Sequence, residues 1–311
     1  MNYRLMNKPR VFLDEKLQKE FDENGFVKFQ MFSKEQVSRI HNFYYKMQEQ
    51  HETVIDKKKF HATNDTDNAN LINETDNFIK QVMFEEMDRH FFNYKTIAAN
   101  YLIKQSSPDS ELGPHQDLRF VDESKFYSLN IWVATQPTDR MNGGLRFLKG
   151  SHRLHDTIRP LPSYPWKYER IALQIPRFFT DVTTEIGECV VLNHACIHAS
   201  YPNSSGQNRI AAILAIVPKE AQIFHYFLPD GNPQNKVEKY AMTLNDFINL
   251  KSGQRPANAW LEEIIEYDFS QVEVPEFMQW VEQNKVEQKL NKKNVYKSIR
   301  NKLSTIFGNI K

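Results

Sequence analysis

The tripeptide His115-Gln116-Asp117 has the residue types and the spacing of a metal-binding element. In an extended segment the side chains of His115 and Asp117 lie on one face, because side chains two residues apart point the same way. With a further neutral imidazole they form the two-histidine, one-carboxylate set that binds Fe(II) and leaves positions open for substrate chemistry. The third ligand is His194 or His198, which share a face if this run is extended. The pattern predicts an iron centre.

Other readings of the same histidines have less support. A helical zinc pair of His194 and His198 lacks the adjacent Glu of metalloproteases, and residues 189–192 favour a strand over a helix. His152 and His155 adjoin a Gly-Ser turn, which is typical of loop histidines. A Ser-His-Asp hydrolase is not indicated, since the chain has no G-x-S-x-G motif.

Size and composition are those of a globular protein with one large domain. The 311 residues are 40% hydrophobic, 13% aromatic and 25% charged, enough for a sizeable core under a soluble surface. Forty basic residues balance 39 acidic ones, so the overall charge gives no reason to expect nucleic-acid binding.

The compartment expected from the sequence is the cytoplasm. Cys189 and Cys196, the two cysteines, are expected to be buried thiols. The N-terminal segment has no apolar run of a signal peptide, and no stretch is long and apolar enough for a transmembrane helix. The last three residues are not a peroxisomal or retention signal.

Helical elements dominate the N-terminal part. The periodicity predicts helices over 14–24, 33–49 and 76–92, the second beginning at a Ser33–Gln36 capping box, and a short strand at 26–29. The polar tract 50–75 is interpreted as a loop, with a mobile lid over a site as the alternative.

From residue 95 the pattern changes to short strands separated by turn residues. They are expected at 96–103, 126–135, 145–148, 188–199 and 209–217. In 126–135 apolar residues alternate with Ser128, Asn130 and Trp132, so one face suits a core and the other a partly polar cavity. The predicted fold is an all-β core with helices (α+β): a double-stranded β-helix, jelly-roll or cupin-like, flanked by N-terminal and C-terminal helices.

The C-terminal part is expected to be helical and rich in loops, with candidate helices at 240–250 and 260–265. Residues 285–311 hold seven Lys and one Arg against one acid, Glu287, with apolar residues on one helical face. Such a helix suits an anionic membrane or a protein partner, or it caps the domain. We therefore expect a domain at 1–280, with its jelly-roll core at about 95–220, and a basic amphipathic helical extension at 281–311.

A set of motifs, in this order and spacing, resembles the phytanoyl-CoA dioxygenase family of Fe(II)/2-oxoglutarate oxygenases. It comprises His115-Gln116-Asp117, Trp132, Asp139…Asn142-Gly143-Gly144-Leu145…Gly150-Ser151-His152, and His198-Ala199-Ser200…Asn203-Ser204…Arg209. The resemblance covers about residues 10–220.

The resemblance implies roles for individual residues. The metal ligands, which are also the catalytic residues, would be His115, Asp117 and His198. His198 is preferred over His194 because Ser200 and Arg209 follow it as in the family. Arg209 would hold the distal carboxylate of 2-oxoglutarate, and the further contacts would come from Gln116, Trp132 and Ser200. A hairpin through residues 203–207 is expected to place the strand of Arg209 beside that of His198, and a guanidinium binds a carboxylate bidentately.

The activity implied by this family is oxidation with Fe(II), 2-oxoglutarate and O2, releasing succinate and CO2. Because Asp117 retains the carboxylate, hydroxylation is expected rather than halogenation, which related enzymes perform with a small residue there. The expected substrate is a small molecule, similar to an amino acid or natural product, oxidised at an unactivated C–H bond. The alternatives are an acyl, sugar or carrier-tethered substrate, and a non-catalytic membrane-associated protein that uses the C-terminal helix.

Overall fold

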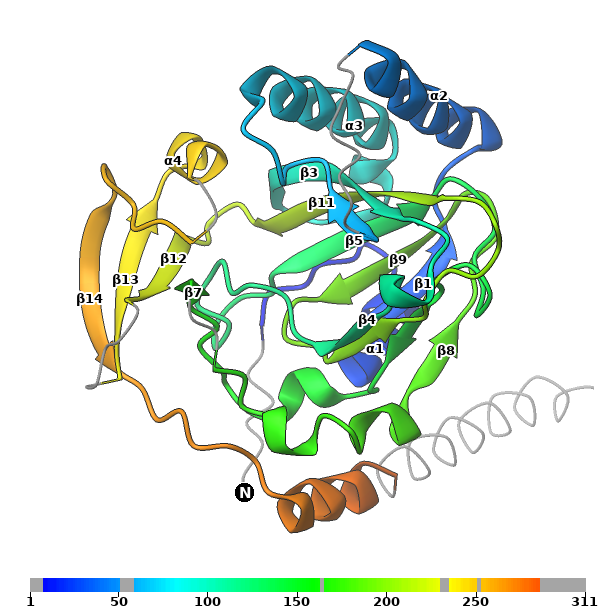
Figure 1. Ribbon diagram of the computed structural model, residues 1–311. Helices are drawn as coiled ribbons and strands as arrows, with labels where there is room; N and C mark the ends of the chain where they lie inside the picture. Colours follow the sequence, from blue (N-terminus) through cyan, green and yellow to red (C-terminus); the bar gives the residue numbers. More distant parts are fainter. Residues whose placement is uncertain (1–7, 51–58, 163–164, 230–234, 251–252, 286–311) are drawn as a thin grey trace, which may run out of the picture. The chain divides into compact units, whose positions relative to one another are not determined.

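The computed structural model describes residues 8–50, 59–162, 165–229, 235–250 and 253–285 (Figure 1). The α-helices are α1 (Glu15–Asn24), α2 (Lys34–Gln50), α3 (Ala69–His90) and α4 (Leu244–Asn249), and residues 274–285 are also helical. The strands are β1 (Phe26–Gln30), β2 (Phe60–Ala62), β3 (Tyr94–Lys104), β4 (Leu112–His115), β5 (Leu129–Ala134), β6 (Leu145–Phe147), β7 (Leu161–Pro162), β8 (Thr180–Val182), β9 (Glu188–Asn193), β10 (His198–Ser200), β11 (Arg209–Pro218), β12 (Ile223–Leu228), β13 (Lys236–Met242) and β14 (Trp260–Glu266).

Capping residues begin the N-terminal helices, and the capping box expected at Ser33–Gln36 is present. The Asp14 carboxylate caps α1, and Gly25, with φ 82°, ends it. At the start of α2, the backbone N–H of Gln36 donates to Ser33 Oγ. The side-chain oxygen of Gln36 accepts from the backbone N–H of Ser33. Helix α3 begins at Ala69, because the Asn68 side chain caps it.

The polar tract 50–75 is therefore not one loop. Residues 60–62 form strand β2, which pairs with β3, and residues 69–75 lie in α3. The prediction of a loop or lid was wrong for those two parts, and residues 51–58 lie outside the described residues. In the first turns of α3, Asn70, Asn73 and Glu74 are exposed, whereas Leu71 and Thr75 are buried.

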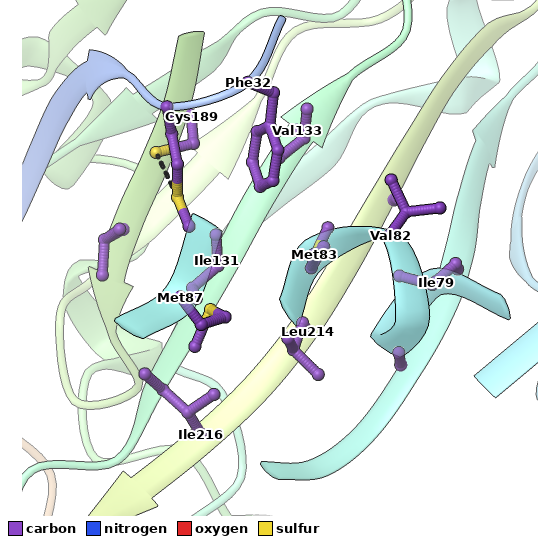
Figure 2. Close-up of a cluster of buried hydrophobic side chains, with 14 of the residues drawn as sticks. Phe32, Ile79, Val82, Met83, Met87, Ile131, Val133, Cys189, Leu214 and Ile216 are labelled. Carbon is purple, nitrogen blue, oxygen red and sulfur yellow. Dashed lines mark hydrogen bonds between the residues drawn. The ribbon is translucent and has the colours of Figure 1, made fainter. Parts of the chain in front are cut away.

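A six-stranded sheet in the order β1-β9-β5-β11-β3-β2 forms the larger half of the core. Helix α3 packs over β3 and β11, with α2 beside it (Figure 1). Figure 2 shows α3 residues such as Met83 and Met87 against Ile131 of β5 and Leu214 of β11. The alternation predicted for residues 126–135 is confirmed over β5, since the neighbours of Ile131 line the opposite face of the sheet.

A smaller sheet, β4-β10-β6-β8, completes the double-stranded β-helix. Between the two sheets lies a second apolar cluster that includes Trp132, Phe147 and Leu192. The predicted β-rich core with a jelly-roll arrangement is confirmed. Gly113 and Pro114, two residue types that are common in turns, lie inside β4.

Strands β12, β13 and β14, which follow residue 218, form a third sheet with β7 in the order β14-β13-β12-β7, and the sequence did not indicate this sheet. The candidate helix 260–265 is wrong, because this segment is strand β14, paired antiparallel with β13. The candidate helix 240–250 is too long, since β13 continues to Met242 and only α4 is helical. A capping box between Thr243 and Asp246 begins α4.

The chain divides into two compact units, 1–166 with 174–269 and 167–173 with 270–311. In the described part of the second unit, the Val272 N–H donates to Lys167 O at 2.8 Å, and Arg170 pairs with Glu273. The predicted basic helix at 285–311 lies, beyond residue 285, outside the described residues. None of the helices in the described ranges combines the length and apolar character needed to traverse a bilayer.

Gly187, just before β9, lies close to the backbone that follows β1. Its replacement is expected to change the stability of the protein. Its φ is 88°, and a Cβ there would lie 2.1 Å from Phe32 O. Gly206 has a similar φ of 82° but open space around it, so it is a matched control. We expect Gly206→Ala to lower the free energy of unfolding by about 1 kcal/mol. Gly187→Ala should lower it by about 3 kcal/mol, because overpacking adds to backbone strain.

Urea denaturation of the two variants measures the difference. The two glycines share a positive φ, but only Gly187 has a close neighbour. An equal loss of unfolding free energy in both variants would therefore contradict a steric effect at Gly187.

Candidate active site

His115, Asp117 and His198 converge at one end of the smaller sheet. Strand β10 pairs antiparallel with β4, which places His198 opposite His115. Nε2 of His115 lies 3.9 Å from Asp117 Oδ1, and Nε2 of His198 lies 3.8 Å from the same oxygen. One ligand atom from each residue falls within 4.8 Å of the others. Two imidazoles and a carboxylate therefore face one point.

The ring orientation of both histidines is fixed by backbone carbonyls. Nδ1 of His115 lies 2.8 Å from Gly113 O, and Nδ1 of His198 lies 2.9 Å from Cys196 O. Since a carbonyl oxygen only accepts, each Nδ1 carries the hydrogen, which leaves Nε2 as the ring atom that faces the carboxylate and can bind a metal. Burial, followed by the neighbouring His198, lowers the pKa of His115 to about 4, so this ring is neutral at pH 7.

Asp117 is held as an anion in the same place. Asn130 Nδ2 donates to Asp117 Oδ2 at 2.9 Å, and the Asp117 N–H donates to His194 O at 2.9 Å. Burial alone would raise the pKa of Asp117, but the surrounding imidazoles and Asn130 outweigh it, so the pKa is lowered. A half-buried carboxylate and two imidazoles that present Nε2 are the donor set that suits Fe(II) with open positions.

His115, Asp117 and His198 line a cavity with a volume of about 370 Å³. Trp132, Ser200 and Arg209 also line it, as do the amide side chains of Asn64 and Asn100. The size is in the range of small-molecule sites.

Part of the cavity wall is an aromatic cluster. Phe120 packs edge-on against His194, with ring centroids 5.1 Å apart, and against Phe247 of α4 at 4.9 Å. All three residues line the cavity.

Arg209 is a buried cation in the cavity wall. It is 1% exposed, its guanidinium lies over the Trp132 ring at 5.4 Å, and its Nε has no hydrogen-bond partner. Among the residues that the structure describes, no carboxylate pairs with it. Burial lowers its pKa to about 10, so it stays charged at neutral pH. A buried charge without a counter-ion indicates an anionic ligand.

The comparisons with known proteins agree with this site. Residues 21–211 match the family model described as phytanoyl-CoA dioxygenase. The chain belongs to the phytanoyl-CoA dioxygenase family. The resemblance inferred from the motifs is thereby confirmed.

Two curated members of the phytanoyl-CoA dioxygenase family come from plants. Phytanoyl-CoA dioxygenase 1 of Oryza sativa subsp. japonica is 27% identical over 136 residues, covering 40% of this chain and 45% of the relative. Phytanoyl-CoA dioxygenase of Arabidopsis thaliana is 27% identical over 132 residues, covering 39% and 43%. The match thus spans less than half of the length of each relative.

A solved structure with the same fold is that of SnoK, described as a non-heme alpha ketoglutarate dependent carbocyclase from nogalamycin biosynthesis. The TM-score is 0.50 at 14% identity, covering 70% of this chain and 89% of SnoK. This likeness supports the double-stranded β-helix of the phytanoyl-CoA dioxygenase family.

Most of the site residues expected from the sequence meet at the cavity, but Gln116 does not line it. The Gln116 side chain donates to Ala195 O at 2.6 Å and accepts from the Thr157 hydroxyl, so it connects loops behind the site. The expected contact between Gln116 and the co-substrate is corrected accordingly.

The expected hairpin between the strands of His198 and Arg209 is also wrong. Strand β10 belongs to the four-stranded sheet and β11 to the six-stranded sheet, so the chain changes sheets between them. His198 and Arg209 nevertheless line one cavity, because the two sheets face each other across it.

Sequence reasoning missed Asn130 as the partner of Asp117, although it had placed this residue on the cavity face of its strand. It also missed Lys104, which lies at the end of β3 and is 0% exposed. A lysine that closes an apolar strand next to a Ser-Ser-Pro turn is ordinarily at the surface, so no sequence signal pointed to its burial.

Proposed function

We propose that the protein is an Fe(II)- and 2-oxoglutarate-dependent dioxygenase that hydroxylates an unactivated C–H bond of a small molecule. The observation that carries this proposal is the convergence of His115, Asp117 and His198 in a cavity that also holds the unpaired cation of Arg209. Membership of the phytanoyl-CoA dioxygenase family supports the same reaction type.

In this proposal His115 and His198 bind iron through Nε2, and Asp117 binds through the carboxylate oxygen that faces them. Iron with 2-oxoglutarate and O2 supplies the oxidation, in which one oxygen atom enters the substrate as hydroxyl and the other enters succinate as CO2 leaves. The protein orients the reactants and excludes water. Asn130 holds the Asp117 carboxylate in place, as outer-sphere partners of metal ligands do.

Arg209 is proposed to bind the far carboxylate of 2-oxoglutarate. Its guanidinium is buried, is oriented by the Trp132 ring and has free donors, and a planar guanidinium matches a carboxylate bidentately. Ser200, in the same wall, offers a hydroxyl to the same carboxylate.

The rest of the cavity favours a substrate of low charge. Apart from Asp117 and Arg209, the described lining side chains carry no formal charge once the imidazoles are neutral. Phe120 and Phe247 offer apolar surface, while Asn64 and Asn100 offer amides. We infer a compact, largely neutral molecule, because the lining residues that the structure describes include no lysine and no second arginine for a polyphosphate carrier such as a coenzyme A thioester.

The proposal is tested by succinate release and O2 uptake with Fe(II), 2-oxoglutarate and a panel of small molecules. Calorimetry with Mn(II) in place of Fe(II) measures co-substrate binding without turnover. Absence of 2-oxoglutarate binding to the Mn(II)-loaded protein would contradict the proposal.

Arg209→Ala is expected to weaken 2-oxoglutarate binding by about 100-fold, because truncation of one side of a buried charge pair has this order of effect. Mn(II) binding in the absence of co-substrate should change little, since Arg209 does not contact the three ligands. Calorimetry measures both constants. Arg39→Ala, at an exposed ion pair with Glu85, is the control and should leave both unchanged. Loss of Mn(II) binding in Arg209→Ala would show that the arginine supports the fold of the site instead.

A further inference from the structure

A second buried cation, Lys104, lies beside Arg209. The two residues are opposite each other in the pairing of β3 with β11. Lys104 is 0% exposed, and its Nζ donates to Ser200 Oγ at 2.7 Å and to Tyr201 O at 2.6 Å. No carboxylate in the described ranges forms an ion pair with it. Two adjacent buried cations without an anion are costly unless a ligand supplies the negative charge.

The hydrogen bond from Lys104 determines whether the Ser200 hydroxyl can donate its hydrogen to a ligand. A hydroxyl has one hydrogen to donate and two lone pairs to accept. Because Lys104 Nζ donates to Oγ, the oxygen acts as acceptor on that side and its own hydrogen remains to be donated. Ser200 lines the cavity together with Arg209, so this hydrogen is available to an acceptor in the cavity.

The turn at residues 142–144 makes room for the lysine. A Cβ on Gly143 would lie 2.5 Å from Lys104 Cδ, and Gly143 has a φ of 90°. On the other side, the Phe60 ring lies 5.6 Å from Lys104 Nζ. The aliphatic part of the Lys104 side chain is therefore closely packed, with Nζ beside Ser200.

We propose that Lys104 is a positioning residue for the far carboxylate of the keto acid. It holds the Ser200 hydroxyl as a donor next to Arg209, and its charge makes this end of the cavity selective for keto acids with a second carboxylate. This inference rests on the proposed function.

The electrostatic surroundings of Lys104 predict a second measurable effect, a pH dependence of ligand binding. Burial, followed by Arg209, lowers the pKa of Lys104 to about 7, while Glu111 acts in the opposite direction. Among the described residues, His115 is a further titratable side chain that interacts with Lys104. An anion beside the ammonium raises its pKa, so binding takes up protons near pH 7. Affinity for the dicarboxylic keto acid therefore falls as pH rises above 7.

The test compares two ligands on Mn(II)-loaded protein by calorimetry: 2-oxoglutarate, and 2-oxobutyrate, which has the keto-acid group but no second carboxylate. Lys104→Met is expected to weaken 2-oxoglutarate binding about tenfold, as for loss of a hydrogen-bonded charge. It should leave 2-oxobutyrate binding unchanged and abolish the extra decline of 2-oxoglutarate affinity above pH 7. Lys95→Met is the control, because Lys95 lies on the same strand and donates to a backbone carbonyl, Ala221 O, remote from the cavity.

Equal weakening of both ligands would overturn the inference, because it would show that Lys104 only connects β3 to β10. Unchanged 2-oxoglutarate binding would overturn it as well. If Lys104→Met does not fold, Ser200→Ala replaces it and should weaken 2-oxoglutarate selectively. Wild-type protein that fails to bind 2-oxoglutarate would overturn the proposed function itself, so the two failures are distinguishable.

Discussion

His198→Ala is expected to abolish metal-dependent turnover and to weaken Mn(II) binding by more than about 100-fold, since even outer-sphere partners of metal ligands contribute 10- to 100-fold. His198 presents Nε2 at 3.8 Å from the Asp117 carboxylate, and no other described side chain replaces it there. The same result is expected for Asp117→Ala, which removes the anionic donor. Binding is measured by calorimetry and turnover by succinate release.

His194→Ala is the matched control, because His194 is also buried, lies in the turn between β9 and the strand of His198, and was the other candidate ligand from the sequence. Its Nδ1 lies 2.7 Å from Ser128 Oγ, and it is absent from the converging set. Mn(II) binding should stay within about tenfold of the wild type, the scale of an outer-sphere change. The opposite pattern, with His194→Ala losing the metal and His198→Ala keeping it, would contradict the proposed ligand set.

Glu123→Ala is expected to lower the free energy of unfolding by about 3–5 kcal/mol, because it removes the carboxylate that faces a buried guanidinium. The side chains of Glu123 and Arg159 are 6% and 0% exposed, and Arg159 Nη2 donates to the Glu123 carboxylate. Arg159 Nε also donates to Asp117 O, so this ion pair supports the backbone of a proposed ligand. Urea denaturation measures the loss. Glu123→Gln, which keeps an acceptor, should lose less.

An exposed ion pair offers the comparison for this loss. Glu85→Ala removes the partner of Arg39, at 40% and 39% exposure, and should cost less than about 1 kcal/mol. A similarly small loss for Glu123→Ala would show that water reaches the buried pair.

The pH dependence of this contribution follows from the direction of the pKa shift. Burial alone would raise the pKa of Glu123, but Arg159 and Arg119 outweigh it, and the pKa falls below its ordinary value of 4.5. A lowered pKa in the folded state stabilises the protein above the unfolded pKa, and the stabilisation is lost as pH falls through the folded value. The difference between wild type and Glu123→Ala should therefore shrink in acid.

The parts of the fold that the sequence predicted are those specified by local pattern. A capping box marked the start of α2, and the alternation in β5 separated Ile131 on the helix side from Trp132 on the cavity side. Strand β14 was missed because its side chains are largely exposed on both faces and give no alternation. Pairing with β13, which is a tertiary contact, determines its conformation.

The errors at the site have a similar physical origin. Gln116 lies between two residues that share a face, so in an extended chain its side chain points away from them, as the structure has it. This error was avoidable from the sequence. The change of sheet between His198 and Arg209 was not, because strand pairing depends on partners such as β3, β4 and β6 that are distant along the chain.

Phe120 and Phe247, whose rings are in contact in the cavity wall, come from two different parts of the sequence. The three converging residues and Arg209 all lie within 21–211, the part shared with the phytanoyl-CoA dioxygenase family, whereas Phe247 lies outside it. Residues after β11, which ends at Pro218, can thus be exchanged or remodelled to reshape the chamber while the proposed metal ligands and Arg209 stay unchanged. Diversification of such proteins toward new molecules is therefore expected to be concentrated in this appended sheet and its short helix.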